Sequence, residues 1–362
     1  MVDHANSSSV EARPAAKPVI VWVDLIRAAA IYFVVMIHVS GQLTNVWGKI
    51  PDSQWLIADV YGGVARISVP LFFMISGYLL LPRSESLRVF FSKRMTKVLI
   101  PFIVWSFIYL FWYCGSHGPA CNTNFVSQLL LVKGTYYHLW FLYSLISIYF
   151  ILPILRLMFR PEIDKRLLWY LIGLWLVFQP VLTIARQVWN FNINISPPLA
   201  TGFLCFFILG YLLGEITLSR TRILLSIALW AAGALITVAG TYTLTSKSGA
   251  YNGIFYDFVS LNVIIASGAA FILLRVMGNS AVFSSSRLQS ITRSLATASF
   301  GIYLIHILVI EILGYGIPWL HITSFIGYPL WSVPLVTTIV FLVSFIVVRG
   351  LQKIPILRAI VP

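Results

Sequence analysis

Long apolar runs follow one another along most of the chain, separated by short polar or basic segments. A helix needs about 20 apolar residues, with a range of roughly 17–25, to cross the hydrocarbon core of a bilayer. Ten runs satisfy this, at residues 19–43, 56–81, 98–115, 138–158, 167–186, 198–217, 222–244, 255–277, 296–316 and 328–349. No repeat of fixed period and no low-complexity linker divides them. The pattern predicts an all-α polytopic membrane protein with ten transmembrane helices in one bundle.

The composition excludes a soluble protein. Hydrophobic residues make up 59% of the 362 residues, charged residues only 10%, and the mean hydropathy is +0.90. Residues 1–18 are polar and lack the apolar core of a cleavable signal peptide, so we expect a flexible tail. The expected organisation is this cytoplasmic tail, a ten-helix membrane domain over residues 19–350, and a second cytoplasmic tail over residues 351–362.

The net charge of +14 orients the chain and does not indicate a nucleic-acid partner. Nineteen of the 25 Lys and Arg residues lie in the two tails, in alternate loops or at the span ends that border them, and only four lie on the opposite side. Basic residues gather on the cytoplasmic side of membrane proteins. Both termini are therefore expected in the cytoplasm.

The first span, DLIRAAAIYFVVMIHVS at residues 24–40, carries ionisable side chains that are costly in lipid. Arg27 and His38 are eleven residues apart, so a helix places them on one face, about 16 Å apart along its axis. One groove could hold an anionic part of a substrate at Arg27 and a reactive end at His38, whose imidazole suits general-base chemistry. The alternative is that His38 only caps polar backbone and Arg27 snorkels towards lipid phosphates.

Further ionisable residues sit in or beside other spans. Asp24 is explained most simply by an i,i+3 ion pair with Arg27. Arg66 in the second span requires a partner from another helix or a bound anion, with Glu311 or a ligand phosphate as candidates. His306 is interpreted as a helix-packing histidine in preference to a participant. The cytoplasmic run LRVFFSKRMTKVLIP either obeys the positive-inside rule or cradles a phosphorylated ligand; its basic residues are Arg88, Lys93, Arg94 and Lys97.

The histidine and cysteine spacings give no metal-binding signal. Cys114 and Cys121 fall in a loop expected on the outer side, where a disulfide and two free thiols are equally compatible with the sequence. Cys205 lies within a span and is interpreted as a small apolar filler.

Five segments, in order along the chain, carry a family resemblance: VDLIRAAAIYFVVMIH, ISVPLFFMISGYLL, FFSKRMTKVLIPF, YYHLWFLYSLISIYFILP and SFGIYLIH. They resemble the acyltransferase-3 family of integral membrane O-acyltransferases, and in particular its branch that includes the O-acetyltransferase acting on enterobacterial common antigen. The resemblance implies a ten-span core, an acyl-CoA donor from the cytoplasm, a glycan acceptor on the far side, and Arg27 and His38 as the essential pair. Lysines replace arginines of the family's basic motif here, which changes how a phosphate would be held.

On this basis we expect a bacterial inner-membrane, multi-pass O-acetyltransferase that moves an acetyl group from acetyl-CoA, as co-substrate, to a hydroxyl of a surface glycan or lipid-linked sugar. No metal is expected, and the surroundings are membrane lipids. His38 would act as general base or accept the acetyl group itself, oriented by Glu311. The donor residues would be Arg88, Lys93, Arg94, Lys97 and Arg66, and the acceptor-side residues His138, Trp140 and Tyr143. A transporter or flippase of a lipid-linked sugar or small solute is the alternative.

Overall fold

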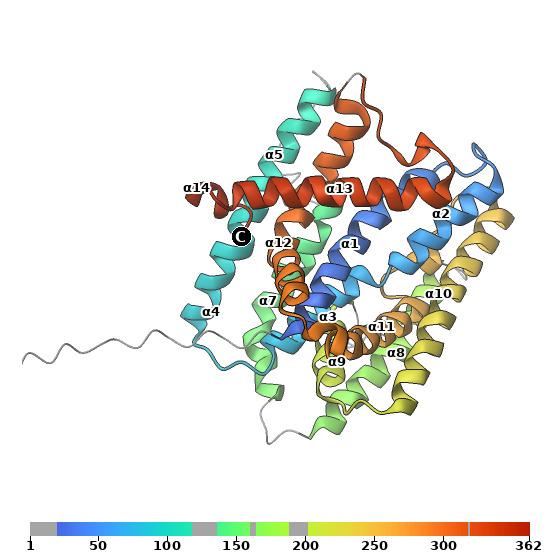
Figure 1. Ribbon diagram of the computed structural model, residues 1–362. Coiled ribbons are helices and arrows are strands. Elements are labelled where there is room, and N and C mark those ends of the chain that lie inside the picture. Colours follow the sequence, from blue (N-terminus) through green and yellow to red (C-terminus); the bar gives the residue numbers. More distant parts are fainter. Residues whose placement is uncertain (1–19, 118–135, 160–163, 188–201, 318) are drawn as a thin grey trace, which may run out of the picture.

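The computed structural model describes residues 20–117, 136–159, 164–187, 202–317 and 319–362, and the secondary structure in these ranges is helical (Figure 1). The main helices are α1 (Val21–Thr44), α2 (Asp52–Ala65), α3 (Ser68–Leu80), α4 (Leu87–Arg94), α5 (Ile100–His117), α7 (Trp140–Leu155), α8 (Lys165–Gln187), α9 (Leu204–Glu215), α10 (Arg220–Ser248), α11 (Leu261–Gly278), α12 (Ser286–Glu311), α13 (Pro329–Leu351) and α14 (Pro355–Arg358).

Each of the ten apolar runs contains helix. Within the described ranges, eight helical segments are long and apolar enough to cross a membrane. The two other expected spans correspond to α8 and to α9, and α9 is only 12 residues long. The prediction of an all-α polytopic membrane protein is confirmed, and the number ten stays a prediction.

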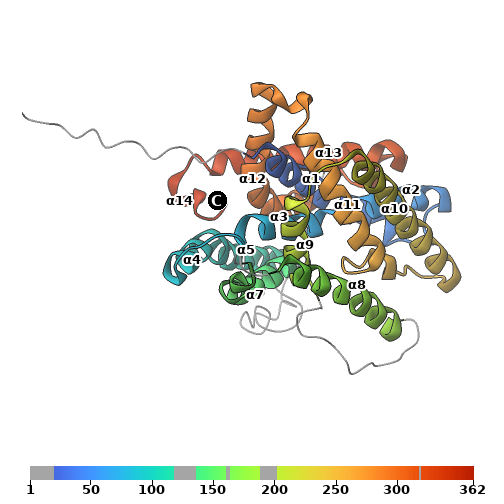
Figure 2. The ribbon, with the colours of Figure 1, turned by 90° about the horizontal axis from the view of Figure 1, so that it is seen from below.

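Helix α1 lies at the centre of the bundle, in contact with α2, α3, α11, α12 and α13 (Figures 1 and 2). Its side chains Ile26, Ile31 and Val35 are fully buried against these neighbours. Figure 1 shows α13 as a long, nearly horizontal helix that crosses α1 and α12, and it contacts both. The ionisable residues of the first span are therefore enclosed by protein on several sides, where polar groups are tolerated in membrane proteins.

The second span is broken in its middle. Helix α2 ends at Ala65 and α3 begins at Ser68, and Pro70 at the third position of α3 has no N–H to continue the α2 hydrogen-bond ladder. Arg66 stands at this break as the C-cap residue of α2. A cationic side chain is thereby positioned inside the bundle, where the helix direction changes.

Helices α3 and α9 approach so closely that only glycine fits at the crossing. A Cβ atom added to Gly77 would lie 2.1 Å from the carbonyl oxygen of Phe207, and one added to Gly210 would lie 2.1 Å from that of Met74. Backbone atoms cannot move aside as flexible side chains can. Small residues at helix crossings are a common device in membrane bundles.

Substitution at this crossing is expected to destabilise the fold. Gly210→Ala should lower the free energy of unfolding by about 2–3 kcal/mol, in the upper range for overpacking. Gly173→Ala on α8 is the matched control, because no atom lies within 4 Å of its added Cβ and alanine favours helix. Thermal melting of both purified variants in detergent measures the difference, and equal melting temperatures would contradict the close crossing.

The bonding state of the cysteines differs with their position in the fold. Cys114 near the end of α5 is disulfide-bonded, and Cys205 on α9 is buried and forms no disulfide, as expected for an apolar filler. Cys121, the expected partner of Cys114, lies outside the described residues.

Candidate active site

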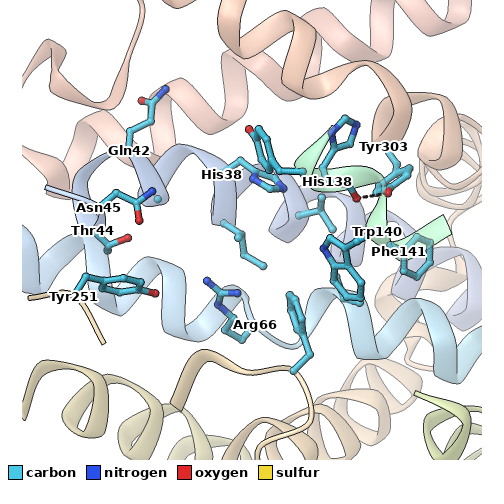
Figure 3. Close-up of a pocket in the computed structure, with 16 residues that line it drawn as sticks. His38, Gln42, Thr44, Asn45, Arg66, His138, Trp140, Phe141, Tyr251 and Tyr303 are labelled. Carbon is cyan, nitrogen blue, oxygen red and sulfur yellow. Dashed lines mark hydrogen bonds between the residues drawn. The ribbon is translucent and has the colours of Figure 1, made fainter. Parts of the chain in front are cut away.

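Three histidines from distant parts of the chain meet next to α1, and Figure 3 shows two of them, His38 and His138. His38 is on α1, His306 on α12 and His138 on the short 3-10 turn that precedes α7. The ring centroid of His306 lies 5.1 Å from that of His38 and 5.4 Å from that of His138. His138 and His306 are buried. The arrangement offers no metal site, since no group of three potential ligands with suitable geometry occurs among the described residues.

Hydrogen bonds to backbone fix the proton of His306. Its Nδ1 lies 2.7 Å from the carbonyl oxygen of Tyr303 and 3.2 Å from that of Ile302. A carbonyl oxygen only accepts, so Nδ1 carries the hydrogen and Nε2 keeps a lone pair. That Nε2 is buried and has no partner among the described residues. His306, interpreted from sequence as a packing residue, thus presents an acceptor nitrogen in the cluster that contains His38.

Glu311 at the end of α12 is held by aromatic donors. Its carboxylate accepts hydrogen bonds from Trp112 Nε1 at 2.5 Å and from the hydroxyl of Tyr136. Burial, the hydrogen bond and the Glu311 charge raise the pKa of Tyr136, which stays protonated as a donor. Within the described ranges no hydrogen bond or ion pair joins Glu311 to His38, and the imidazole beside His38 is that of His306.

An outer cavity of about 360 Å³ opens beside His38 (Figure 3). Two of the three residues expected on the acceptor side, His138 and Trp140, line it, whereas Tyr143 packs edge-on against Phe102 of α5. Arg66 also lines this cavity. A second, more open cavity of about 680 Å³ adjoins it and shares with it the residues Arg66, Trp140, Tyr251 and Phe258.

An inner cavity of about 740 Å³ lies at the opposite end of the bundle, where α1 begins and α13 ends. Arg27 lines it, with the Asp24 carboxylate 3.9 Å from its guanidinium, and so does Lys97. Three further basic residues line this cavity, Arg349, Lys353 and Arg358. In the sequence these three residues served only to orient the chain; their i,i+4 and i,i+5 spacing, from the end of the last span onward, was the signal that could have found them.

The other basic residues expected at a donor site lie elsewhere. Lys93 and Arg94 are ion-paired with Glu85, at 2.9 and 3.4 Å, and Arg156 reaches the same carboxylate at 3.1 Å. Arg88 is exposed on α4. None of Arg88, Lys93 and Arg94 is among the described residues that line the inner cavity. Of the four residues in the cytoplasmic run, the structure brings only Lys97 to it.

Low pH is expected to weaken the ion pairs that Glu85 forms with Lys93, Arg94 and Arg156. Burial by itself would raise the pKa of Glu85, but hydrogen bonds from Lys93 and Arg156 and the charge of Arg94 hold it below its ordinary value of 4.5. A lowered pKa in the folded state means that the stabilisation is present above about pH 4.5 and is lost as the pH falls through the folded-state pKa.

Glu85→Gln should therefore lower the free energy of unfolding by about 1.5–3 kcal/mol at pH 7, the usual contribution of hydrogen bonds to a charged group. Thermal melting of wild type and variant at pH 7 and at successive values down to pH 4 measures this. The difference should narrow only as the pH drops below 4.5, and a difference that disappeared already at pH 6 would contradict the lowered pKa.

The inner and outer cavities share part of their lining inside the bundle. Phe141 and Tyr303 are the described residues that line both, and the hydroxyl of Tyr303 donates to the carbonyl oxygen of His138 at 2.6 Å. Arg27 lines one cavity and His38 the other, two positions of one helix separated by about 16 Å. A basic chamber at one end of the bundle and a histidine-lined chamber nearer the other thus have two wall residues in common.

Comparison with known proteins supports a chemical interpretation of these chambers. A family model described as "Acyltransferase domain", of the acyltransferase-3 type, matches residues 20–349. A serine/alanine racemase of Enterococcus gallinarum is 29% identical over 164 residues, which make up 43% of this chain and 22% of that protein. The match therefore spans about a fifth of that relative's length. No solved structure matches the chain.

Proposed function

The chain belongs to the acyltransferase-3 family of membrane acyltransferases, and from this premise we propose that it transfers an acetyl group from cytoplasmic acetyl-CoA to a hydroxyl of an extracytoplasmic or lipid-linked cell-surface sugar. The same proposal places it in the bacterial inner membrane. One observation carries it: a basic inner cavity and a histidine-lined outer cavity share Phe141 and Tyr303.

The inner cavity suits the donor. Coenzyme A carries several phosphate charges, and charge-assisted hydrogen bonds from Arg and Lys are the strong contacts for such groups. The position of this cavity at the expected cytoplasmic end allows loading from the cytosol. Five basic side chains line it, namely Arg27, Lys97, Arg349, Lys353 and Arg358. We assign the nucleotide part of coenzyme A to this set. Of the residues proposed from the sequence, Arg27 and Lys97 are retained in it.

The flexible arm of the donor would then follow the face of α1 from Arg27 towards His38. The axial distance between these residues, about 16 Å, is comparable to the length of an extended pantetheine arm. The thioester would arrive at Phe141 and Tyr303, where the two cavities meet. The acceptor hydroxyl would approach from the outer cavity, beside His38 and Trp140.

His38 is the proposed base. It removes the proton from the sugar hydroxyl as the oxygen attacks the thioester carbonyl; a C–O bond forms, the C–S bond breaks, and the proton passes from the imidazolium to the departing thiolate of CoA. In the covalent variant, a nitrogen of His38 attacks the thioester carbonyl, a C–N bond forms, the C–S bond breaks and CoA leaves as the thiolate. The sugar hydroxyl then attacks the acetyl-imidazole, a C–O bond forms, the C–N bond breaks, and the hydroxyl proton passes to the CoA thiolate. In either case the lone pair of His306 Nε2 faces the cluster in which the imidazolium would develop.

Purified protein tests the proposal. Incubation in detergent with acetyl-CoA and glycan extracted from the host should release free CoA, and mass spectrometry should show one added acetyl group on the glycan. Host cells with the gene deleted should carry glycan without that group. A transporter or flippase would leave both acetyl-CoA and its cargo chemically unchanged, so unaltered acetyl-CoA together with identical glycan masses in the two strains would reject the enzyme.

A further inference from the structure

Among the described residues no carboxylate forms an ion pair with Arg66 of the outer cavity, and the charges of Asp59 and Asp257 act on it from beyond ion-pair distance. Its Nε is buried and has no hydrogen-bond partner, and among the described residues no carboxylate lies within ion-pair distance of its guanidinium. It is also the one charged side chain among the described residues that line this cavity, if the histidines are neutral. An unpaired buried charge is costly, so its presence calls for a partner that arrives from outside the protein.

The nearest carboxylate along the helix, that of Asp59, is bound at one oxygen by a tyrosine, and its Oδ2 is buried without a hydrogen-bond partner. Asp59 lies two turns before Arg66 on α2, and the sequence analysis passed over it. Its Oδ1 accepts a hydrogen bond from the hydroxyl of Tyr256 at 2.6 Å. The ring of the same Tyr256 lies under Arg66, with the guanidinium carbon 4.2 Å from the ring centroid. One tyrosine thus binds the carboxylate by its hydroxyl and the cation by its ring.

This stacking leaves the donors of Arg66 available. A guanidinium that lies over an aromatic ring keeps its N–H groups in its own plane, directed past the edge of the ring. A second ring, that of Phe258, lies 5.3 Å from the guanidinium carbon. Figure 3 shows the Arg66 side chain in the cavity with His38 and Trp140. The geometry is that of a site for a carboxylate or phosphate, which accepts two parallel N–H bonds from arginine.

We propose that Arg66 binds an acidic group of the acceptor, so that the substrate is an anionic sugar such as a uronic acid or a sugar phosphate. The inference rests on the proposed function, because it places the reacting hydroxyl beside His38 and the acidic group at Arg66 within one cavity. The remaining wall is aromatic and neutral polar, with Trp140, Tyr251 and Asn45. Such a wall suits the ring and hydroxyls of a sugar.

Calorimetric titration of the purified full-length protein in detergent tests the site. The probes are glucuronic acid, its neutral methyl ester, glucose 1-phosphate and methyl glucoside. Wild type should bind at least one acidic probe about tenfold to a hundredfold more tightly than its neutral counterpart, the range expected for hydrogen bonds to a charged group. The carboxylate and phosphate arms show which acid the site prefers. If neither acidic probe binds more tightly than its neutral counterpart, the proposal is overturned.

Substitutions of Arg66 and Arg27 test which arginine gives the preference for acidic probes. Arg66→Gln should reduce the ratio of acidic to neutral affinity to about one, and Arg66→Lys should retain part of it, since lysine keeps the charge but not the fork. Arg27→Gln is the matched control, a guanidinium removed from the inner cavity, and should keep the preference. Persistence of the full preference in Arg66→Gln would overturn the assignment.

A separate readout distinguishes this inference from the proposed function. Release of CoA and acetylation of host glycan without any preference for acidic probes would keep the enzyme and reject the anion site. A preference for acidic probes that depends on Arg66, in a protein that never cleaves acetyl-CoA, would keep the anion site and reject the acetyltransferase.

Discussion

Replacing His38 by alanine is expected to lower the rate of acetyl transfer by about 10²–10⁴-fold, the usual contribution of a positioned general acid or base. His38 stands where the outer cavity meets the histidine cluster, with the ring of His306 5.1 Å away between centroids. His138 also lines this cavity, from the turn before α7. The measurement is the rate of CoA release with host glycan, together with the acetyl content of that glycan.

A second histidine provides the control for this variant. His321 is exposed, in the turn after α12, and its Nδ1 bonds the carbonyl oxygen of Gly314 at 3.2 Å. His321→Ala should keep the wild-type rate, and both variants should reach the membrane in equal amounts. Normal glycan acetylation in cells that contain only the His38→Ala protein would remove His38 from the chemistry.

Removing basic side chains from the inner cavity is the change with the second largest expected effect. The double variant Arg349→Gln/Lys353→Gln should raise the KM for acetyl-CoA by about a hundredfold or more, because each charge-assisted hydrogen bond contributes roughly 1.5–3 kcal/mol. The value of kcat should change less, since these contacts are made equally in the ground state and the transition state. Initial rates of CoA release at varied acetyl-CoA concentration give both constants.

The matched control removes two positive charges from the same side of the protein but outside the cavity. In Arg88→Gln/Lys93→Gln the lost side chains lie on α4, where Arg88 is exposed and Lys93 pairs with Glu85. Its KM should stay within a few-fold of wild type. The reverse result, a raised KM in the α4 variant alone, would return the nucleotide to the cytoplasmic run that the sequence analysis favoured.

The sequence was sufficient for the helices because a bilayer restricts what can cross it. Backbone polar groups must be satisfied within each spanning segment, so a long apolar run has helix as its solution, and each of the ten runs contains one. The break in the second span was harder to predict from the sequence. Pro70 indicated a disturbed helix, but the position of Arg66 at the turn depends on how α2 and α3 pack against α1 and α9.

Within the site, the sequence could relate residues only along one helix. The periodicity of α1 gives Arg27 and His38 their common face, because 3.6 residues make one turn. No such rule connects His38 with His306, which lie 268 positions apart and meet through the packing of α1 on α12. Likewise, Glu311 has Trp112 and Tyr136 as its hydrogen-bond partners, and these contacts depend on the rotation of three separate elements.

The basic residues show a different limit. Positive charges near span ends look alike in sequence whether they orient the chain or hold a ligand. Only the three-dimensional structure separates Lys97, which lines the inner cavity, from Lys93, which pairs with Glu85 two residues before α4 begins. A basic run in a loop is therefore a topology signal first, and a binding site only when its side chains converge on a common space.

The rings of Phe141 and Tyr303 have one more consequence, for the energy supply of the cell. Water-filled chambers that approach each other from the two faces of a membrane would short-circuit its proton and ion gradients if they joined as an open pore. At the meeting point of the chambers described here stand two aromatic side chains, each less than a tenth exposed. A narrow apolar constriction sheds its water and blocks hydrated ions. In the proposed enzyme, the pair at which donor and acceptor would come together is therefore also expected to block ion leakage between the two chambers.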